Sequence, residues 1–218
     1  MAEPPLEQPR PSEQGPPLTL RRLFGLDRSG PPPTQTQAGQ PLRPWTIPNA
    51  IGFTRLALIP VFLILALSSR NGTGALIAII FGVIGWGDYA DGIAARVTRQ
   101  YSRLGALMDP VTDRLLVICG VVVTWDFHLL PRWALAVLAV RELGMLLVGR
   151  YALSRGVELR INWPGRLAVA PVMGSFFFAI CTLTKFAEVL LFIGLALALI
   201  ATVLYGISGT RQLQQSSP

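Results

Sequence analysis

Long apolar runs recur along the chain from Ala50 onward, and short polar stretches separate them. Several runs approach the ~20 residues that a helix needs to cross a hydrocarbon core of about 30 Å. The pattern predicts an all-α, polytopic membrane protein with six transmembrane helices in one bundle. The predicted spans are Pro48–Leu67, Thr73–Ala95, Leu104–Trp125, Pro131–Leu153, Pro164–Leu183 and Ala187–Ile207. Because the connectors are short, consecutive helices should be antiparallel neighbours.

The segments that flank these runs differ from them in composition. Residues 1–43 are rich in Pro, Gln and Gly, which predicts a disordered cytoplasmic tail. We expect residues 44–210 to form the membrane domain and residues 211–218 a second, short cytoplasmic tail. Only 14% of the whole chain is charged, against about 25% in soluble domains. A soluble fold would therefore lack the charged surface it requires.

Basic residues lie mainly on one side of the predicted membrane topology. One side carries the N-terminal tail with its arginines, together with Arg96, Arg99, Arg103, Arg155, Arg160 and Arg211, whereas the other carries Arg70, Arg132 and Lys185. Cytoplasmic loops hold the excess of positive charge, so both termini are predicted to be cytoplasmic. The loop arginines also account for the net charge of +7, and no nucleic-acid partner is expected.

Four aspartates interrupt the second and third predicted helices near their cytoplasmic ends. Asp88 and Asp91 are three residues apart, and Asp109 and Asp113 are four apart. Both spacings place a pair on one helix face. The loop between the two helices is short, so we expect the four carboxylates to converge at one depth. We call these four residues the acidic cluster.

The acidic cluster requires compensating cations. An aspartate within a span costs about 2.5–3.5 kcal/mol, and grouping like charges raises the cost. Two divalent ions would balance four carboxylates, and oxygen ligands suit Mg²⁺ or Mn²⁺ better than Zn²⁺. One alternative is a set of ion pairs with Arg96 and Arg103. Another is a cation channel or transporter that uses the cluster as its ion site.

Small residues accompany the acidic cluster on the same helix faces. Gly92 and Ala95 share a stripe with the first aspartate pair, and Gly105 shares one with Asp109. These positions leave room for a flat ligand beside the metals. Close helix–helix packing would use the same small residues.

The segment from Asp88 to Asp113 fits the pattern D-x2-D-G-x2-A-R-x8-G-x3-D-x3-D at all eight fixed positions. These eight positions, which we call the signature, are Asp88, Asp91, Gly92, Ala95, Arg96, Gly105, Asp109 and Asp113. The signature resembles that of the CDP-alcohol phosphatidyltransferases. Similarity to the phosphatidylglycerophosphate synthase and cardiolipin synthase branch extends to TIPN at 46–49, Thr54, Arg55, Asp109-Pro110, Arg141-Glu142 and Gly165-Arg166. Arg166 departs from the lysine usual in that branch, and Arg114 departs from the lysine commoner in phosphatidylglycerophosphate synthases.

The resemblance implies transfer of a phosphatidyl group from CDP-diacylglycerol to an alcohol, with release of CMP, in phospholipid biosynthesis at the inner (cytoplasmic) membrane. It implies two Mg²⁺ or Mn²⁺ ions on the acidic cluster, with Asp113 acting as general base, as metal ligand or as both. Gly92, Ala95 and Gly105 would line the cytidine pocket, with Arg96 near the phosphates. The expected acceptor is glycerol 3-phosphate; phosphatidylglycerol and an inositol phosphate are the alternatives. The family also implies a homodimer.

Three further arginines are candidates for binding anions. Arg141 lies within the fourth predicted helix and could bind an acceptor head group or pair with its neighbour Glu142. Arg166 belongs to a cytoplasmic-side basic group with Arg150, Arg155 and Arg160, which suits an acceptor phosphate; membrane orientation explains the loop members equally well. Arg55 in the first helix needs an anionic partner, for which the diphosphate is a candidate.

Overall fold

The computed structural model describes residues 44–98, 100–154 and 163–215. This part of the chain folds into helices without a strand: α2 (Ile47–Ser68), α3 (Ala75–Thr98), α4 (Arg103–Asp126), α5 (Arg132–Ser154), α6 (Trp163–Ile180) and α7 (Thr184–Gln215). The predicted tail at 1–43 lies outside the described residues, and so do Arg99, Arg155 and Arg160.

Each predicted span coincides with one of these helices, so the all-α prediction is confirmed for the described residues. Within the described residues, three helices, α2, α3 and the Thr184–Leu204 part of α7, are long and apolar enough to cross a membrane by length and composition. Helices α4 and α5 fall short because ionisable side chains, among them Asp113 and Glu142, interrupt their apolar runs. The crossing of a membrane by all six helices therefore stays a prediction.

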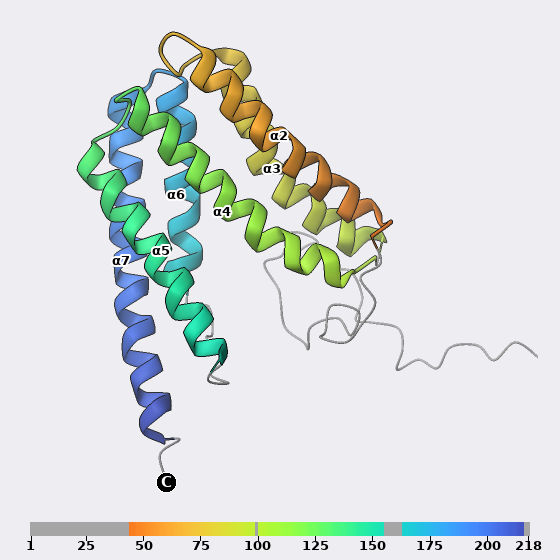
Figure 1. Ribbon diagram of the computed structural model, residues 1–218, viewed down its shortest axis with the longest axis vertical. Coiled ribbons are helices and arrows are strands. Elements are labelled where there is room, and N and C mark those ends of the chain that lie inside the picture. Colours follow the sequence, from red (N-terminus) through yellow and green to blue (C-terminus); the bar gives the residue numbers. More distant parts are fainter. Residues whose placement is uncertain (1–43, 99, 155–162, 216–218) are drawn as a thin grey trace, which may run out of the picture.

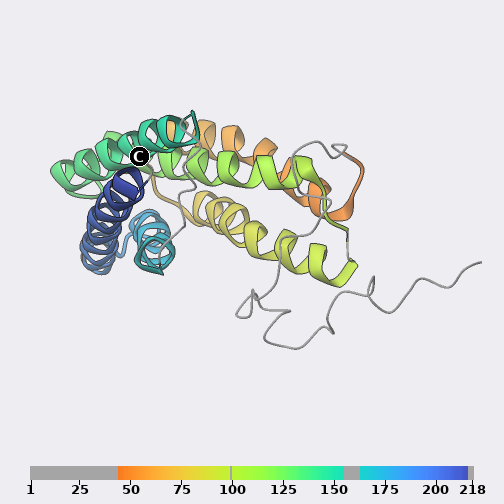
Figure 2. The ribbon, with the colours of Figure 1, turned by 90° about the horizontal axis from the view of Figure 1, so that it is seen from below.

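The helices lie in two layers. They also divide into two groups, α2–α4 and α5–α7, which spread apart toward one end. Figure 2 shows α5, α4 and α2 in one layer and α7, α6 and α3 in the other. In Figure 1, α2, α3 and α4 run away from α5, α6 and α7, and the two groups meet near the top of the view. Helix α4 contacts α2, α3, α5 and α6, so it joins the two groups.

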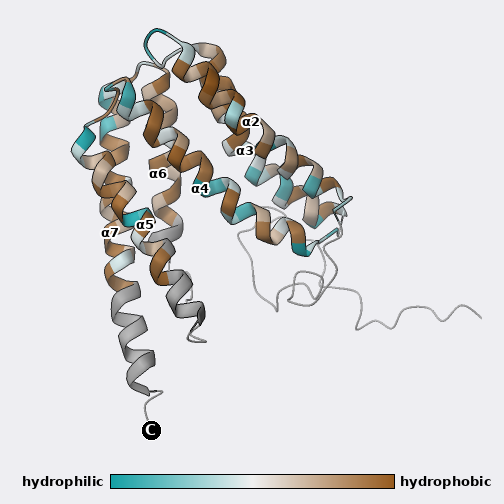
Figure 3. Ribbon diagram, viewed as in Figure 1, coloured by the Kyte–Doolittle hydropathy of each residue, from teal (hydrophilic) through white to brown (hydrophobic). Residues whose placement is uncertain are grey.

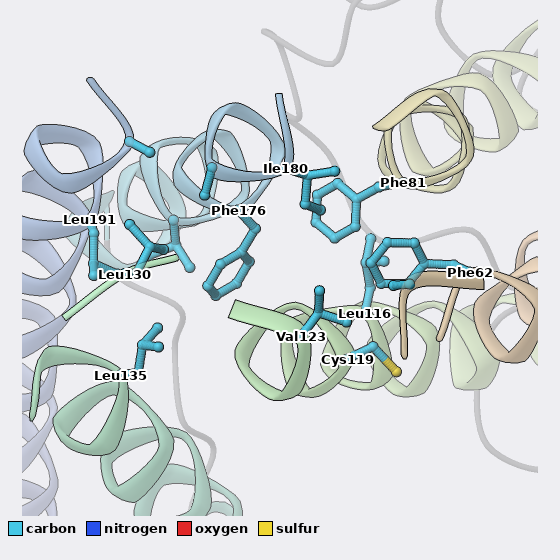
Figure 4. Close-up of a cluster of buried hydrophobic side chains, with 14 of the residues drawn as sticks. Phe62, Phe81, Leu116, Cys119, Val123, Leu130, Leu135, Phe176, Ile180 and Leu191 are labelled. Atoms are coloured by element: carbon cyan, nitrogen blue, oxygen red, sulfur yellow. The ribbon is translucent and has the colours of Figure 1, made fainter. Parts of the chain in front are cut away.

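The hydrophobic core lies at the end where the two groups meet, which we call the core end. Every described helix contributes to it: the buried side chains include Phe62, Phe81, Leu116, Val123, Leu135, Phe176, Ile180 and Leu191 (Figure 4). Lipid tails are as apolar as these side chains, so close packing rather than exclusion from water holds such helices together. Gly120 shows how close the packing is, because a Cβ there would lie 2.5 Å from Cδ2 of Phe176.

The far end of α2, α3 and α4 is the end that we call the site end; α2 and α4 begin there, and both have polar N-caps. The Thr46 side chain accepts a hydrogen bond from the Asn49 amide at the start of α2, over 3.3 Å. The Ser102 side chain accepts one from the Gly105 amide at the start of α4, over 2.9 Å. A serine or threonine cap satisfies an amide that has no partner within its helix. These caps fix where α2 and α4 begin beside the end of α3.

Candidate functional site

Polar side chains gather where the first turns of α2 and α4 meet the last turns of α3. Figure 3 shows hydrophilic residues along the site-end halves of α3 and α4, within helices that are otherwise mostly hydrophobic. The short connection between α3 and α4 brings the two halves of the signature together, as the sequence predicts.

The side chain of Arg55, from α2, lies among three carboxylates of the acidic cluster. Its Nη1 atom donates to Oδ2 of Asp91 over 2.9 Å and to Oδ1 of Asp88 over 3.3 Å. Its Nη2 atom donates to Oδ1 of Asp113 over 3.0 Å. The predicted convergence of aspartates from two helices is therefore present for these three, and one guanidinium joins them.

The three carboxylates differ in how far they are exposed. The side chain of Asp91 is only 8% exposed, whereas those of Asp88 and Asp113 are 47% and 44% exposed. Asp91 thus depends on Arg55 most strongly, and the other two carboxylates can also be approached from outside. Within the described residues, no group of three or more His, Cys, Asp or Glu side chains is arranged to hold a metal ion.

A pocket of about 200 Å³ lies beside these ion pairs. Its walls come from the start of α2, the end of α3, the α3–α4 connection and the start of α4. The lining residues are Pro48, Asn49, Gly52, Asp91, Gly92, Ala95, Arg96, Gln100, Tyr101, Ser102, Gly105, Ala106, Met108 and Asp109. Six of the eight signature positions are among them; Asp88 and Asp113 are the other two.

A hydrogen-bonded network of Asn49, Ser102 and Gly105 forms one wall of this pocket. The Ser102 hydroxyl donates to Oδ1 of Asn49 over 2.7 Å while it accepts from the Gly105 amide over 2.9 Å. The Asn49 side-chain amide also donates to the carbonyl of Pro44 over 3.1 Å. Asn49 and Ser102 are 1% and 6% exposed, so the network is buried and ties α2 to α4.

Glycines at the site make room for polar side chains. A Cβ on Gly105 would lie 2.8 Å from Oδ1 of Asn49, and one on Gly87 would lie 2.6 Å from Cδ of Arg55. A Cβ on Gly92 would lie 3.3 Å from Nη2 of Arg96, whose guanidinium therefore folds back along α3. The small residues of the signature line the pocket, and Gly92 and Gly105 also leave room for side chains; their role beside a ligand stays a prediction.

A second polar cluster joins α4, α5 and α7. Arg141 donates from Nε to Oγ1 of Thr202 over 3.1 Å and from Nη1 to Glu142. The Nη1 atom of Arg114 lies 3.6 Å from Oε2 of Glu142 and, although buried, has no hydrogen-bond partner among the described residues. Of the two roles predicted for Arg141, pairing with Glu142 is the one seen in the structure. The side chains of Arg150 and Arg166 lie outside the described part of the chain.

Sequence reasoning missed the central position of Arg55 and the network around Asn49. It named Arg96 and Arg103 as ion-pair partners only as an alternative, and it expected an anionic partner such as the diphosphate for Arg55; the structure has Arg55 joining three of the aspartates. The signal for Arg55 was available, because an arginine within an apolar helix needs an anionic partner. Asn49 belongs to the TIPN segment at 46–49 that the sequence singles out, but no signal linked it to Ser102, which lies 53 residues away in the chain.

Comparison with known proteins identifies the same family that the signature resembles. Residues 45–204 match the sequence model of a family described as CDP-alcohol phosphatidyltransferase. A putative cardiolipin synthase of Mycobacterium tuberculosis is 39% identical over 135 residues, which cover 60% of this chain and 62% of that protein. A cardiolipin synthase (CMP-forming) of Streptomyces coelicolor is 35% identical over 136 residues, or 60% and 63% of the two chains.

Another relative aligns over a longer stretch at lower identity. It is a CDP-diacylglycerol–glycerol-3-phosphate 3-phosphatidyltransferase of Shigella flexneri, 28% identical over 167 residues, which cover 73% of this chain and 88% of that protein. The match to the mycobacterial and streptomycete relatives spans less than two thirds of their length.

Proposed function

This chain belongs to the CDP-alcohol phosphatidyltransferase family, and we propose that it transfers a phosphatidyl group from CDP-diacylglycerol to an alcohol, with release of CMP. The observation that carries the proposal is the gathering of the signature at the site end. Six signature positions line one pocket, and the other two, Asp88 and Asp113, share the guanidinium of Arg55 with Asp91. A cation channel would require no pocket of this composition beside its acidic residues.

The donor atoms of the acidic cluster are of the kind that two divalent ions require, although the carboxylates, all among the described residues, are not arranged around an ion in the structure. All its donor atoms are carboxylate oxygens, which suit Mg²⁺ or Mn²⁺, and three of the carboxylates already lie within 3.3 Å of one cation, Arg55. With that guanidinium the cluster carries a formal charge of −3, which two divalent ions convert to +1. Bound ions would polarise the phosphorus under attack and stabilise the leaving CMP.

Asp113 is the proposed general base. Its side chain is 44% exposed, unlike that of Asp91, so an acceptor hydroxyl can approach it. The carboxylate takes the hydroxyl proton as the acceptor oxygen forms its bond to the phosphorus of the phosphatidyl group. The bond from that phosphorus to the oxygen of CMP breaks, and CMP leaves with the bonding electron pair.

The pocket is the proposed site of the cytidine. Gly92, Ala95 and Gly105 lack bulk and line it, and Arg96 lies at its wall, where we propose that it contacts the diphosphate. A volume of about 200 Å³ is below the roughly 300–1,000 Å³ of sites that enclose a drug-sized ligand. The acyl chains of the donor would therefore lie outside the pocket, against apolar helix surfaces.

Glycerol 3-phosphate is the proposed acceptor, and the relative that aligns over the greater part of both chains supports it. Phosphatidylglycerol is a second candidate, favoured by the higher identity to proteins named as cardiolipin synthases. Both acceptors offer a primary hydroxyl on a glycerol that carries a phosphate. The Nη1 atom of Arg114, which lies 3.6 Å from Glu142 but makes no hydrogen bond to the described residues, gives the cluster of Arg141 and Glu142 a donor for such an anion, and we propose that Arg166 serves it too.

The proposed topology has six spans in the inner membrane, with both termini and the site end in the cytoplasm. The one-sided distribution of arginines supports this orientation. It places the acidic cluster on the side where a water-soluble nucleotide product can leave. The expected homodimer stays a prediction.

The experiment that tests this function measures CMP release by the purified protein with CDP-diacylglycerol and Mg²⁺, one acceptor at a time. We expect release with glycerol 3-phosphate, none without an acceptor, and none after addition of EDTA until Mg²⁺ is restored. Release with phosphatidylglycerol alone would reassign the acceptor. Failure of every acceptor would contradict phosphatidyl transfer, and turnover that persists in EDTA would contradict the two-ion site.

A further inference from the structure

We propose that Arg55 is a built-in counter-cation, which holds Asp88, Asp91 and Asp113 in place when no divalent ion is bound and competes with the ions for these carboxylates. The part that concerns the ions rests on the proposed function. The part that concerns the metal-free protein stands on the contacts of Arg55 alone.

The position of Arg55 is fixed by α3 independently of the carboxylates. Its Nε atom donates to the backbone carbonyl of Ile84 over 2.9 Å, and its aliphatic stem lies against Gly87. With only 2% of its surface exposed, the residue has little freedom to turn away. The guanidinium is therefore aimed at the acidic cluster by the backbone it packs against, and each of its three nitrogens has a defined partner.

Arg55 and the acidic cluster depend on each other for stability in the metal-free protein. A buried ion pair contributes little compared with a well-packed apolar substitute, but removal of one partner leaves an uncompensated buried charge and is strongly destabilising. Asp91 would be the residue left in that state, because its side chain is almost as buried as that of Arg55. Loss of the guanidinium should therefore lower the stability of the metal-free protein.

The same contacts oppose metal binding. The carboxylate oxygens that Arg55 contacts at 2.9–3.3 Å are the atoms that would ligate the ions, so a divalent ion must draw them away from the guanidinium or share them with it. In both cases the carboxylates attract the ion less strongly, because the positive charges of the ion and of the guanidinium repel each other in a partly buried site. Removal of Arg55 should thus destabilise the metal-free protein and tighten metal binding. A residue with a merely structural role would not produce these opposite signs.

The test uses the full-length protein, purified in detergent, with Arg55→Gln and Arg55→Lys variants. Thermal unfolding is measured in EDTA and in Mn²⁺, and Mn²⁺ affinity is measured from the electron paramagnetic resonance signal of the free ion, without substrate. We expect Arg55→Gln to unfold at a lower temperature than the wild type in EDTA. Addition of Mn²⁺ should raise its unfolding temperature by more than that of the wild type, and it should bind Mn²⁺ about tenfold more tightly. Arg55→Lys, which keeps the charge but loses the fork of donors, should lie between Arg55→Gln and the wild type.

Arg141→Gln is the matched control, because it removes another arginine that pairs with an acid within a helix. It should lower the unfolding temperature in EDTA and leave Mn²⁺ affinity unchanged. The proposal is overturned if Arg55→Gln binds Mn²⁺ no more tightly than the wild type, or if its stability in EDTA is unchanged. If Arg55→Gln does not fold, Arg55→Lys decides by the same two measurements. A wild type that binds no Mn²⁺ overturns the metal site itself, and with it the competition.

Discussion

Replacement of Gly105 by alanine tests the wall of the pocket directly. The new Cβ would lie 2.8 Å from Oδ1 of Asn49 and 3.2 Å from Oγ of Ser102. Neither atom can retreat freely, because the Ser102 hydroxyl joins Asn49 to the Gly105 amide through bonds of 2.7 and 2.9 Å. Both residues are buried, so a displaced group would lose a partner without gaining water.

The size of the effect on stability follows from three contributions. Overpacking of a closely packed site costs about 1–3 kcal/mol, and loss of a serine N-cap costs about 1 kcal/mol. Alanine within a helix is better than glycine by roughly 0.5–1 kcal/mol, which offsets part of this cost. Gly105→Ala should therefore destabilise the protein by about 1–3 kcal/mol, seen as a lower unfolding temperature in detergent.

The same substitution should weaken binding of the nucleotide donor. Asn49, Ser102 and Gly105 line the pocket, so a methyl group and the side chains it displaces reduce the space for the cytidine. The KM for CDP-diacylglycerol, measured by CMP release in mixed micelles, should rise while the KM for the acceptor stays constant. A rise in the acceptor KM alone would show that the pocket is not the nucleotide site.

Gly85→Ala provides the matched control. A Cβ on Gly85 would meet nothing within 4 Å, although this glycine also lies in α3, a helix that reaches the site end. The control should unfold at the wild-type temperature or slightly above it, with an unchanged KM for the donor. If Gly105→Ala behaves like Gly85→Ala in both measurements, the contact with Asn49 is refuted.

Three further predictions test separate parts of the structure. Asp113→Asn should lower kcat by at least about 100-fold, the usual loss for a general base, while the circular dichroism spectrum stays helical. Ser102→Ala should cost about 1 kcal/mol through loss of the α4 cap, and Ser102→Thr, which retains the hydroxyl, should cost less in the same thermal unfolding assay. Gly120→Ala should cost about 1–3 kcal/mol, because its Cβ would lie 2.5 Å from Phe176, and should leave the KM for the donor unchanged.

Each of these predictions has a contradicting result. Appreciable turnover by folded Asp113→Asn would exclude an essential base. Equal unfolding temperatures for Ser102→Ala and the wild type would show that α4 does not depend on this cap. A raised donor KM in Gly120→Ala would mean that the core end and the site end are not independent.

The helices could be predicted because each corresponds to one continuous apolar run of the sequence that is long enough to form a helix. Membrane crossing was harder to predict for α4 and α5, since the residues that matter for chemistry also lower their hydropathy. Asp113 and Arg114 in α4, and Arg141 with Glu142 in α5, are charges that a span tolerates only when partners within the protein compensate them. Arg141 and Glu142 are neighbours in one helix, but other partners, such as Arg55 for Asp113 and Thr202 for Arg141, come from other helices and are not visible in the local pattern.

The candidate site likewise has features that the local sequence predicts and features that depend on contacts between helices. The convergence of Asp88, Asp91 and Asp113 could be predicted, because helix periodicity and one short loop determine it. The contact of these residues with Arg55 depends on how α2 packs against α3 and α4, which no spacing within one segment encodes. The bond between Asn49 and Ser102 likewise crosses from α2 to α4. Sequence reasoning therefore gave the two halves of the signature and named Arg55 and TIPN at 46–49, but it did not predict the contacts by which these residues of α2 join the two halves.

Separation of the core end from the site end explains how this chain tolerates so many buried polar groups. Side chains from all the described helices pack at the core end, where the polar groups are few and satisfied within their own helices, as Thr124 is by the carbonyl of Gly120. At the site end, among the described residues, only α2, α3, α4 and the connection between α3 and α4 enclose the acidic cluster and its pocket. Packing at one end can therefore offset the cost of charge at the other. Substrate and ions, which neutralise that charge, should stabilise the site end selectively, because what binds only the folded state stabilises it.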